Sequence, residues 1–456
     1  MAIATINPYN NKEVKTFEAL SEKQIEDKIS TADKAYASWK EKPVEERTKL
    51  LTKVAALLQE RKKELAKLIT LEMGKLISES EDEIDISSAI YKYYADNAAE
   101  FLEDKPFEVK EGKAYVRYSP IGVILGVEPW NYPFYQVARI TAPNLAAGNV
   151  IMIKHASNVP QCAQAIEDIF KEAGAEEGVY TNLFIGGDKI GKLAEDDRIK
   201  GLSLTGSEKA GASLAEAAGK NLKKSVLELG GSDPFIVLED ADLDHAVSQA
   251  FDGRMKNMGQ SCTAAKRMIV VESIADEFLE KLTKKMSGLK VGDPADESTE
   301  VGPLSSEGAA KQLAEQVEET IKAGATAVIG GKRLDREGAF MQPTILTDIK
   351  PGMRAYHEEL FGPVASFYRV KDENEAIKLA NDSDFGLGGA VFSKDIKRAE
   401  KVALQIETGM VFINSPTNSS PELPFGGTKR SGYGRELSSL GIEEFVNKKL
   451  IRITEN

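Results

Sequence analysis

The chain has 456 residues, enough for two or three domains with large cores, and its 42 % hydrophobic and 29 % charged residues are typical of an ordinary globular protein. Its 59 lysines and arginines stand against 72 acidic residues, which leaves a formal net charge of −13. This excess of acids argues against nucleic acid or an anionic membrane as the main partner, since both require basic surfaces.

Cysteine and histidine content narrows the class further. Cys162 and Cys262 are the two cysteines, too few for a disulfide framework or most structural zinc sites, and three scattered histidines predict no metal site. Residues 1–11 lack the basic and apolar parts of a signal peptide, and no apolar run approaches the roughly 18 to 20 residues of a membrane span. We therefore expect a cytoplasmic protein.

The first hundred residues have the pattern of successive helices. Ser21-Glu22-Lys23-Gln24 is a capping box that precedes apolar residues at helical spacing. Pro43 is expected to open a second helix, and the helical pattern continues to about Leu102 with a possible break at Gly74.

Residues 107–118 change to alternating polarity around Gly112, which predicts a β-hairpin that pairs outside the domain. A regular series of apolar strands and helices follows, and it predicts a parallel sheet covered on both faces, with ligands beyond the carboxyl ends of its strands. The expected strands are Ile121–Val127, Val150–Ile153, Asn182–Ile185, Gly201–Leu204 and Ser225–Leu229.

A second α/β series begins at Pro234–Leu238. Its further expected strands are Lys266–Val271, Thr326–Ile329, Val364–Val370, Gly389–Phe392 and Met410–Ile413. The alternating tail Lys448–Thr454 predicts an exposed strand that, with the hairpin, pairs between subunits of a homodimer or homotetramer. We expect one domain at 1–106 and 121–229, a second at 230–430, and a small β oligomerisation arm at 107–120 and 431–456.

Two residues stand out as candidates for chemistry. Cys262 lies between a helical run and a strand, so its thiol is expected on a loop, although most isolated cysteines are buried and inert. Glu228, 34 positions upstream, places one carboxylate in an otherwise apolar strand. Apolar neighbours raise the pKa of a carboxyl, which suits a general base near neutrality.

Three further segments are compatible with ligand binding, and each also has an ordinary structural explanation. Gly206, Ser207 and Gly211 join a strand to a helix whose free N–H groups suit a phosphate, yet a Thr-Gly-Ser turn is also a common helix cap. Asn131 follows a strand, where its amide suits an oxyanion or merely a proline-rich turn. Lys154 ends the next strand, where a cation suits a ribose or phosphate or simply faces solvent.

Seven motifs occur in an order that resembles the aldehyde dehydrogenases over nearly the whole chain, in particular the short bacterial succinate-semialdehyde dehydrogenases. They are Pro129-Trp130-Asn131-Tyr132-Pro133, Lys154, Leu204-Thr205-Gly206-Ser207, Leu227-Glu228-Leu229-Gly230-Gly231, Gly259-Gln260-Ser261-Cys262, Glu358-Glu359-Leu360-Phe361-Gly362-Pro363 and Pro424-Phe425-Gly426-Gly427. The resemblance implies an α/β fold of two doubly wound parallel-sheet domains, the first binding the cofactor and the second catalytic.

The resemblance also implies a mechanism. The Cys262 thiolate attacks the aldehyde carbon to form a thiohemiacetal, whose oxyanion the Asn131 amide and the Cys262 N–H hold. Hydride transfer to nicotinamide leaves a thioester on Cys262, and Glu228 activates the water that hydrolyses it.

The family pattern further implies the cofactor contacts. Lys154 is expected at the adenosine ribose, Ser207 at the pyrophosphate, Glu359 at the nicotinamide ribose and Phe361 beside the ring. The remaining expected contacts are Trp130, Gly206, Gly211 and Leu229. Many NAD-specific relatives have a glutamate where this chain has Ser157, so we expect NADP to be accepted or preferred, alongside NAD.

Substrate recognition is expected at Arg139, where semialdehyde-oxidising relatives keep an arginine. Ser261 and Ser419 are expected to complete a site for a carboxylate. The predicted reaction is therefore oxidation of succinate semialdehyde to succinate.

The same residues favour other functions less. Another small aldehyde, glutarate semialdehyde or a simple alkanal, is the alternative within the family, whereas CoA-acylating relatives typically lack a base matching Glu228. A thiol hydrolase is disfavoured because no histidine lies near Cys262. Retention of Asn131, Glu228 and Cys262 gives no support to a catalytically silent scaffold.

Overall fold

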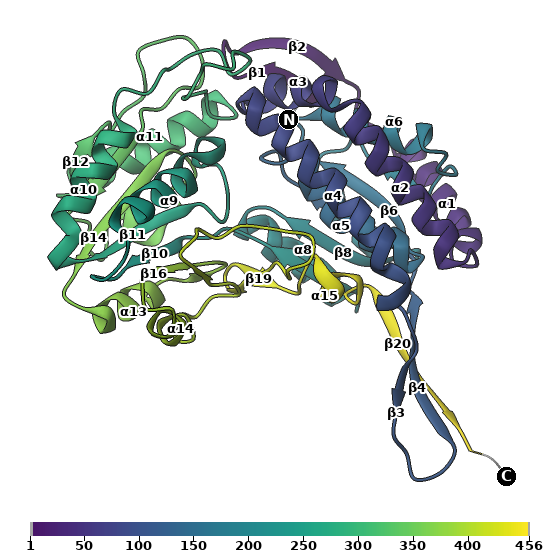
Figure 1. Ribbon diagram of the computed structural model, residues 1–456. Coiled ribbons are helices and arrows are strands. Elements are labelled where there is room, and N and C mark those ends of the chain that lie inside the picture. Colours follow the sequence, from purple (N-terminus) through teal and green to yellow (C-terminus); the bar gives the residue numbers. More distant parts are fainter. Residues whose placement is uncertain (1–2, 455–456) are drawn as a thin grey trace.

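Two sheets with helices on both faces organise the computed structural model, which describes residues 3–454 (Figure 1). The first sheet has the strand order β19-β9-β8-β5-β6-β7. Its strands are β5 (Val123–Glu128), β6 (Val150–His155), β7 (Tyr180–Asn182), β8 (Ile199–Thr205), β9 (Lys224–Glu228) and β19 (Gly432–Tyr433). All are parallel except β19, which runs antiparallel to β9 at the edge. Their nearly continuous apolar runs are buried, as expected for a sheet covered on both faces.

The helices of this first body are mostly those that the sequence predicts. They are α1 (Glu22–Trp39), α2 (Val44–Glu60), α3 (Lys62–Met73), α4 (Ile77–Phe101), α5 (Tyr135–Ala147), α6 (Pro160–Glu172), α7 (Ile190–Glu195), α8 (Glu208–Lys220), α15 (Ser438–Ile442) and the 3₁₀ turn η1 (Gly187–Lys189). The capping box is confirmed, since Ser21 and Gln24 exchange side-chain and backbone hydrogen bonds. The break at Gly74 is also confirmed: this glycine ends α3 with a φ of 76°, in the left-handed region that favours glycine.

The second sheet has the order β12-β13-β14-β11-β10-β16-β17 and carries the green helices of Figure 1. Its strands are β10 (Asp233–Val237), β11 (Ala265–Val271), β12 (Thr326–Ile329), β13 (Thr344–Thr347), β14 (Val364–Val370), β16 (Ala390–Phe392) and β17 (Phe412–Ile413). Its helices are α9 (Leu243–Met255), η2 (Lys256–Gly259), α10 (Glu272–Met286), α11 (Glu307–Lys322), α12 (Arg354–His357), α13 (Glu373–Asn381) and α14 (Ile396–Ala403). Only the edge pair β12 and β13 is antiparallel.

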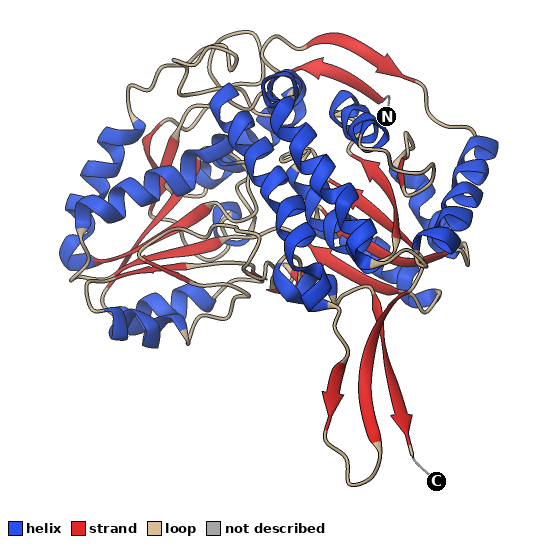
Figure 2. Cartoon of the chain, turned by 45° about the vertical axis from the view of Figure 1, so that its right-hand side comes forward, coloured by secondary structure: helices blue, strands red, loops and turns tan. Residues whose placement is uncertain are grey.

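A narrow three-stranded arm projects from the first body (Figure 2). It consists of β3 (Lys105–Phe107), β4 (Lys113–Pro120) and β20 (Val446–Ile453), so the predicted hairpin is confirmed. The predicted C-terminal strand pairs with β4 of its own chain. Because Gly432–Tyr433 belongs to the first sheet, we propose that the C-terminal part of the arm begins at Val446 rather than at 431.

Some predictions of strands were wrong or incomplete. The strand expected at Asn182–Ile185 lies at Tyr180–Asn182, because pairing with β6 ends there and the chain then turns toward Gly186-Gly187. Five short pairing segments and β13 were not predicted, since none has a long alternating or apolar pattern. The five are β1 (Ile3–Asn7) with β2 (Lys12–Phe17), β15 (Phe385–Gly386) with β18 (Thr428–Lys429), and β19, which pairs with β9. No helix within residues 3–454 combines the length and the apolar character needed to cross a membrane.

Candidate active site

The loop that carries Cys262 begins with a strained turn. Asn257 and Met258 have φ angles of 54° and 52°, followed by Gly259 at 71°. Left-handed backbone at non-glycine residues costs of order 1 kcal/mol or more, and such strain is typical of functional sites. The Glu79 carboxylate accepts the Asn257 N–H at 3.0 and 3.1 Å, and the Asn257 amide donates to Asn131 O at 2.9 Å. These bonds hold the turn in a single arrangement.

Asn131 contacts the same loop from the carboxyl end of β5. Its side-chain amide is buried and donates to Gln260 O at 3.1 Å, which leaves its second amide hydrogen for another acceptor. The Cys262 N–H has no acceptor within residues 3–454. One donor on the Cys262 loop and one that contacts this loop are therefore available, which is compatible with an oxyanion site.

Cys262 lines a cavity of about 420 Å³ between the two bodies, within the size range of small-molecule sites. Its walls include Tyr132, Tyr135, Arg139, Ser261, Thr263, Ser419 and Phe425. Burial raises the pKa of the Cys262 thiol to about 12, although Arg139 and Lys266 oppose this shift. The thiol thus needs an opposing positive field to ionise near neutral pH.

Arg139, Ser261 and Ser419 line this one cavity, but Arg139 already has a counter-ion. Its Nε lies 2.7 Å from a Glu436 oxygen, in an ion pair that lacks hydrogen-bond alignment. Its side chain is fully buried and also lies 4.3 Å from the Phe425 ring centre. The Tyr135 hydroxyl bridges Arg139, at 3.3 Å, to Ser419. Arg139 is therefore neither a solvent-facing helix residue nor a free cation.

Glu228 does not line the cavity. It ends β9 at 2 % exposure, and neither of its carboxyl oxygens has a hydrogen-bond partner in the described chain. A Cβ on Gly426 would come within 2.8 Å of its Oε1, which places the carboxyl against that glycine. Burial, and then Glu436, raise the pKa of Glu228 well above its ordinary value. Both effects favour the neutral form of this carboxyl over the ionised form.

Several charged residues of the site were not predicted from the sequence, among them Glu436, Glu128 and Lys256. The sequence around Glu436 gives no sign of its role, because it pairs with Arg139, a residue far away in the chain, only in the folded structure. Glu128 is buried at the end of β5, and burial followed by Glu436 raises its pKa well above the ordinary value. The sequence pattern that identified Glu228, a carboxylate at the end of an apolar strand, would also have identified Glu128. Lys256 lies at the rim of the cavity six residues before Cys262, and it forms no ion pair in residues 3–454.

The predicted cofactor residues lie on the carboxyl side of the first sheet and on the facing loop. Ser207 caps α8 by accepting the Ala210 N–H, and a Cβ on Gly211 would come within 2.6 Å of Leu229, so this glycine allows α8 to pack against the end of β9. The Gly206 N–H is used internally, donating to Glu228 O. Glu359 accepts the Gly231 N–H at 3.2 Å.

A dinucleotide presents phosphates, hydroxyls and planar rings, and this region has residues that suit each of them. Lys154 is half-buried with no ion pair in the described part of the chain, and burial lowers its pKa. A desolvated cation without a carboxylate partner favours an anion or hydroxyl from a ligand. Ser157, three residues later, contributes no acid that would repel a phosphate. Phe361 and Trp130 pack edge to face with ring centres 5.8 Å apart, which gives this region an apolar aromatic surface. These residues fit the cofactor.

Comparison with known proteins gives a consistent result. The family model described as "Aldehyde dehydrogenase family" matches residues 1–451. A succinate-semialdehyde dehydrogenase [NADP(+)] of Deinococcus radiodurans is 55 % identical over 449 residues, which cover 98 % of this chain and 94 % of that protein. A succinic semialdehyde dehydrogenase of Streptococcus pyogenes, solved with NADP⁺ as the cofactor, has a TM-score of 0.98 at 46 % identity, with 99 % of this chain and all of that one covered.

A more distant relative has the same fold. The betaine aldehyde dehydrogenase of Staphylococcus aureus, solved as a point mutant with NAD⁺, is 33 % identical with a TM-score of 0.95, over 99 % of this chain and 94 % of that one. The predicted α/β fold is confirmed by these likenesses. The chain belongs to the aldehyde dehydrogenase family.

Proposed function

We propose that this protein oxidises succinate semialdehyde to succinate, with NADP as the preferred hydride acceptor and NAD also accepted. The observation that carries the proposal is that Arg139, Ser261 and Ser419 share one cavity with Cys262. A cation and hydroxyls set back from a nucleophile suit a short aldehyde with a carboxylate at its far end. The relatives from Deinococcus radiodurans and Streptococcus pyogenes support the same substrate.

In the proposed reaction Cys262 acts as the nucleophile, and the Asn131 amide and the Cys262 N–H bind the oxyanion that forms. The bound nicotinamide supplies a hydride acceptor. Glu228 then takes a proton from the water that attacks the thioester on Cys262. For this step its side chain turns from Gly426 and Glu436 toward the cavity, and its raised pKa makes it an effective base once ionised.

We propose that the cation that recognises the substrate carboxylate, Arg139, remains paired with Glu436. Glu436 neutralises part of the Arg139 field, so Arg139 contributes through Tyr135 and Ser419, and Ser261 adds a hydroxyl to the same cavity. Lys256 is a second cation at the mouth of the cavity and has no competing ion pair in the described chain. It is therefore included in the proposed site.

The cofactor preference is proposed to depend on Lys154 and Ser157. An uncompensated lysine attracts a 2′-phosphate, whereas a glutamate at 157 would repel it. Wild-type and Ser157→Glu enzyme, each assayed with NADP and NAD, test this point. A large fall in the NADP/NAD ratio of kcat/KM is expected, and an unchanged ratio would remove Ser157 as the cause.

The substrate is tested by comparing kcat/KM for succinate semialdehyde with that for butanal, an uncharged aldehyde of the same carbon length. A preference of several hundred-fold corresponds to roughly 3 to 4 kcal/mol of carboxylate recognition. Comparable rates would retain the family chemistry but exclude the semialdehyde. In that case the pairing of Arg139 with Glu436 would favour a simple alkanal, the second candidate.

Two further proposals concern the assembly of the protein and the compartment in which it works. Phe107, Leu450 and Ile453 are exposed apolar residues of the arm, and we propose that they pack between copies in a homodimer or homotetramer. Because Cys262 reacts only as a free thiol, we propose that the protein works in a reducing compartment, the cytoplasm.

A further inference from the structure

Lys266 occupies an irregular position in the second sheet. Asp233 pairs with Ala265 and Pro234 with Arg267, so Lys266 is the extra residue of a bulge at the start of β11. Bulges next to active sites re-aim a side chain out of the regular alternation. The Lys266 side chain is only 3 % exposed. A buried ammonium at such a position requires specific partners.

Those partners are the nucleophile loop and one acidic residue. Lys266 Nζ donates to Ser261 O at 2.7 Å and to Cys262 O at 2.8 Å, and it lies 3.0 Å from Glu359 Oε1. The two carbonyls accept two of the three ammonium hydrogens, and Glu359 is the counter-ion of the charge. One lysine therefore ties the backbone on both sides of the nucleophile to Glu359.

Glu359 leads to the region where the cofactor is proposed to bind. The Phe361 ring, two residues later, lies 5.9 Å from Lys266 Nζ and packs against Trp130. The Glu359 oxygen that faces Lys266 also accepts the Gly231 N–H. A carboxylate held by exchangeable polar contacts can be recruited by ligand hydroxyls, and Lys266 then loses its counter-ion.

We propose that Lys266 is a positioning residue that couples Glu359 to the reactivity of Cys262, so that engagement of Glu359 by the cofactor activates the nucleophile. This inference rests on the proposed function, in which Glu359 holds the nicotinamide ribose. When ribose hydroxyls occupy Glu359, the Lys266 charge acts on the loop without its nearest anion. The two loop carbonyls keep the ammonium in place while this happens.

The charges around the thiol give the sign of the effect. Apart from burial itself, Arg139 and Lys266 lower the pKa of Cys262, whereas Glu359 and Asp233 raise it. Tyr132 and Tyr135 pack nearby as neutral hydroxyls. Removing the Lys266 charge is therefore expected to decrease the thiolate fraction, and removing the Glu359 charge to increase it.

The test measures the rate of Cys262 alkylation by iodoacetamide against pH, in full-length enzyme without cofactor, with the modified peptide identified by mass. Lys266→Met is expected to react about ten-fold more slowly at pH 8, and Glu359→Gln several-fold faster. Lys266→Arg should recover most of the wild-type rate. Lys281→Met, which removes a surface lysine that pairs with Asp244 and Glu277, should match wild type.

The second readout adds NADP⁺. NADP⁺ should increase the rate of Cys262 alkylation in the wild type. Lys266→Met should still bind NADP⁺, as measured by fluorescence titration, but its rate of Cys262 alkylation should not increase. Unchanged pH profiles and unchanged acceleration in Lys266→Met would overturn the proposal, and Lys266→Arg decides the matter if Lys266→Met does not fold. A wild type that binds no NADP⁺ would instead overturn the proposed function, and the cofactor-free profiles would still decide the link between Lys266 and Cys262.

Discussion

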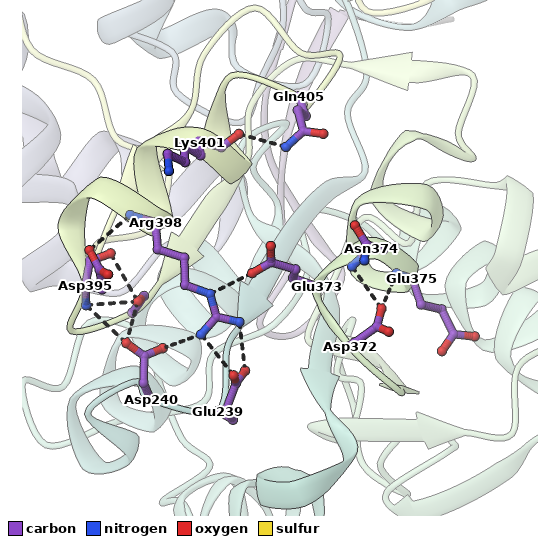
Figure 3. A network of polar contacts seen from close by, with 11 residues as sticks. Glu239, Asp240, Asp372, Glu373, Asn374, Glu375, Asp395, Arg398, Lys401 and Gln405 are labelled. Carbon is purple, nitrogen blue, oxygen red and sulfur yellow. Dashed lines mark hydrogen bonds and ion pairs between the residues drawn. The ribbon is translucent and has the colours of Figure 1, made fainter.

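Two clusters in this protein have nearly the same composition in opposite surroundings. Arg139 lies among Glu128, Glu228 and Glu436 with no exposed side-chain surface. Arg398, on α14, binds Glu239, Asp240 and Glu373 at the surface, where its side chain is 28 % exposed (Figure 3).

The pKa directions of the two clusters are opposite. Burial raises the pKa of Glu228, whereas the Arg398 hydrogen bonds lower that of Glu239. Water solvates the surface carboxylates, so one arginine suffices to keep them ionised; the interior cannot solvate three anions around one arginine. Solvent access, more than the number of charges, therefore decides whether the carboxyl groups around an arginine have raised or lowered pKa values.

The largest expected effect is on turnover. Glu228 is the one member of the buried cluster that we propose to act on water. Replacing it in Glu228→Gln should lower kcat by roughly 10²- to 10⁴-fold. The thioester should accumulate on Cys262, detected by mass after one turnover. Wild-type turnover in this variant would mean that Glu228 belongs to the cluster without acting as the base.

Glu436→Gln should cause the largest loss of stability. It leaves Arg139 charged, buried and unpaired, a change that typically costs about 3 to 5 kcal/mol. Denaturant unfolding at pH 7 measures the loss. Glu373→Gln is the matched surface control and should cost less than about 1 kcal/mol. Equal losses at the two sites would contradict the comparison.

Glu128→Gln should instead stabilise the protein at neutral pH. A carboxyl whose folded-state pKa is raised contributes its full stability below its ordinary pKa and loses it as pH rises toward the folded-state pKa. The advantage of the variant over wild type should therefore grow from pH 5 upward by up to about 1.4 kcal/mol per pH unit. Unfolding curves from pH 5 to 8 measure it, and a pH-independent difference would show that Glu128 is ionised.

Arg398→Met should have the smallest effect, about 1 kcal/mol or less, and salt should reduce it. Because its contacts lower the pKa of Glu239, this stabilisation is present above the ordinary pKa of that group and is lost as pH falls through the lowered value. Thermal unfolding at low and high salt, at pH 7 and pH 3, checks both dependences. A salt-independent loss would indicate a packing role for the arginine stem.

The sequence predicts those features of the fold that depend on local pattern. Strands such as Val364–Val370 were correct because a parallel strand is a continuous apolar run between turn signals. The segment Thr344–Thr347 was missed because four residues after a proline carry too little pattern. The positions of Cys262 and Glu228 at element ends were likewise readable, since each depends on its immediate neighbours.

The missed parts of the site depend on tertiary register. Nothing local marks Glu436 as the counter-ion of Arg139, and the aim of Lys266 follows from a bulge that arises only when β10 and β11 pair. Whether Arg139 is a free cation for a substrate or a paired one is decided by a residue nearly 300 positions away. Such pairings cannot be inferred from motif spacing.

The pairing of β4 with β20 has a consequence for biosynthesis. Roughly 330 residues of chain separate the two strands, so a ribosome adding about 5 to 20 residues per second makes the second strand roughly 15 to 65 s after the first. During that interval most of the first body, from α1 to β9, can fold while one edge of β4 stays unpaired, whereas β19 and α15 are made shortly before β20. The arm is therefore completed late in translation, which delays any assembly through it until the catalytic body has been made.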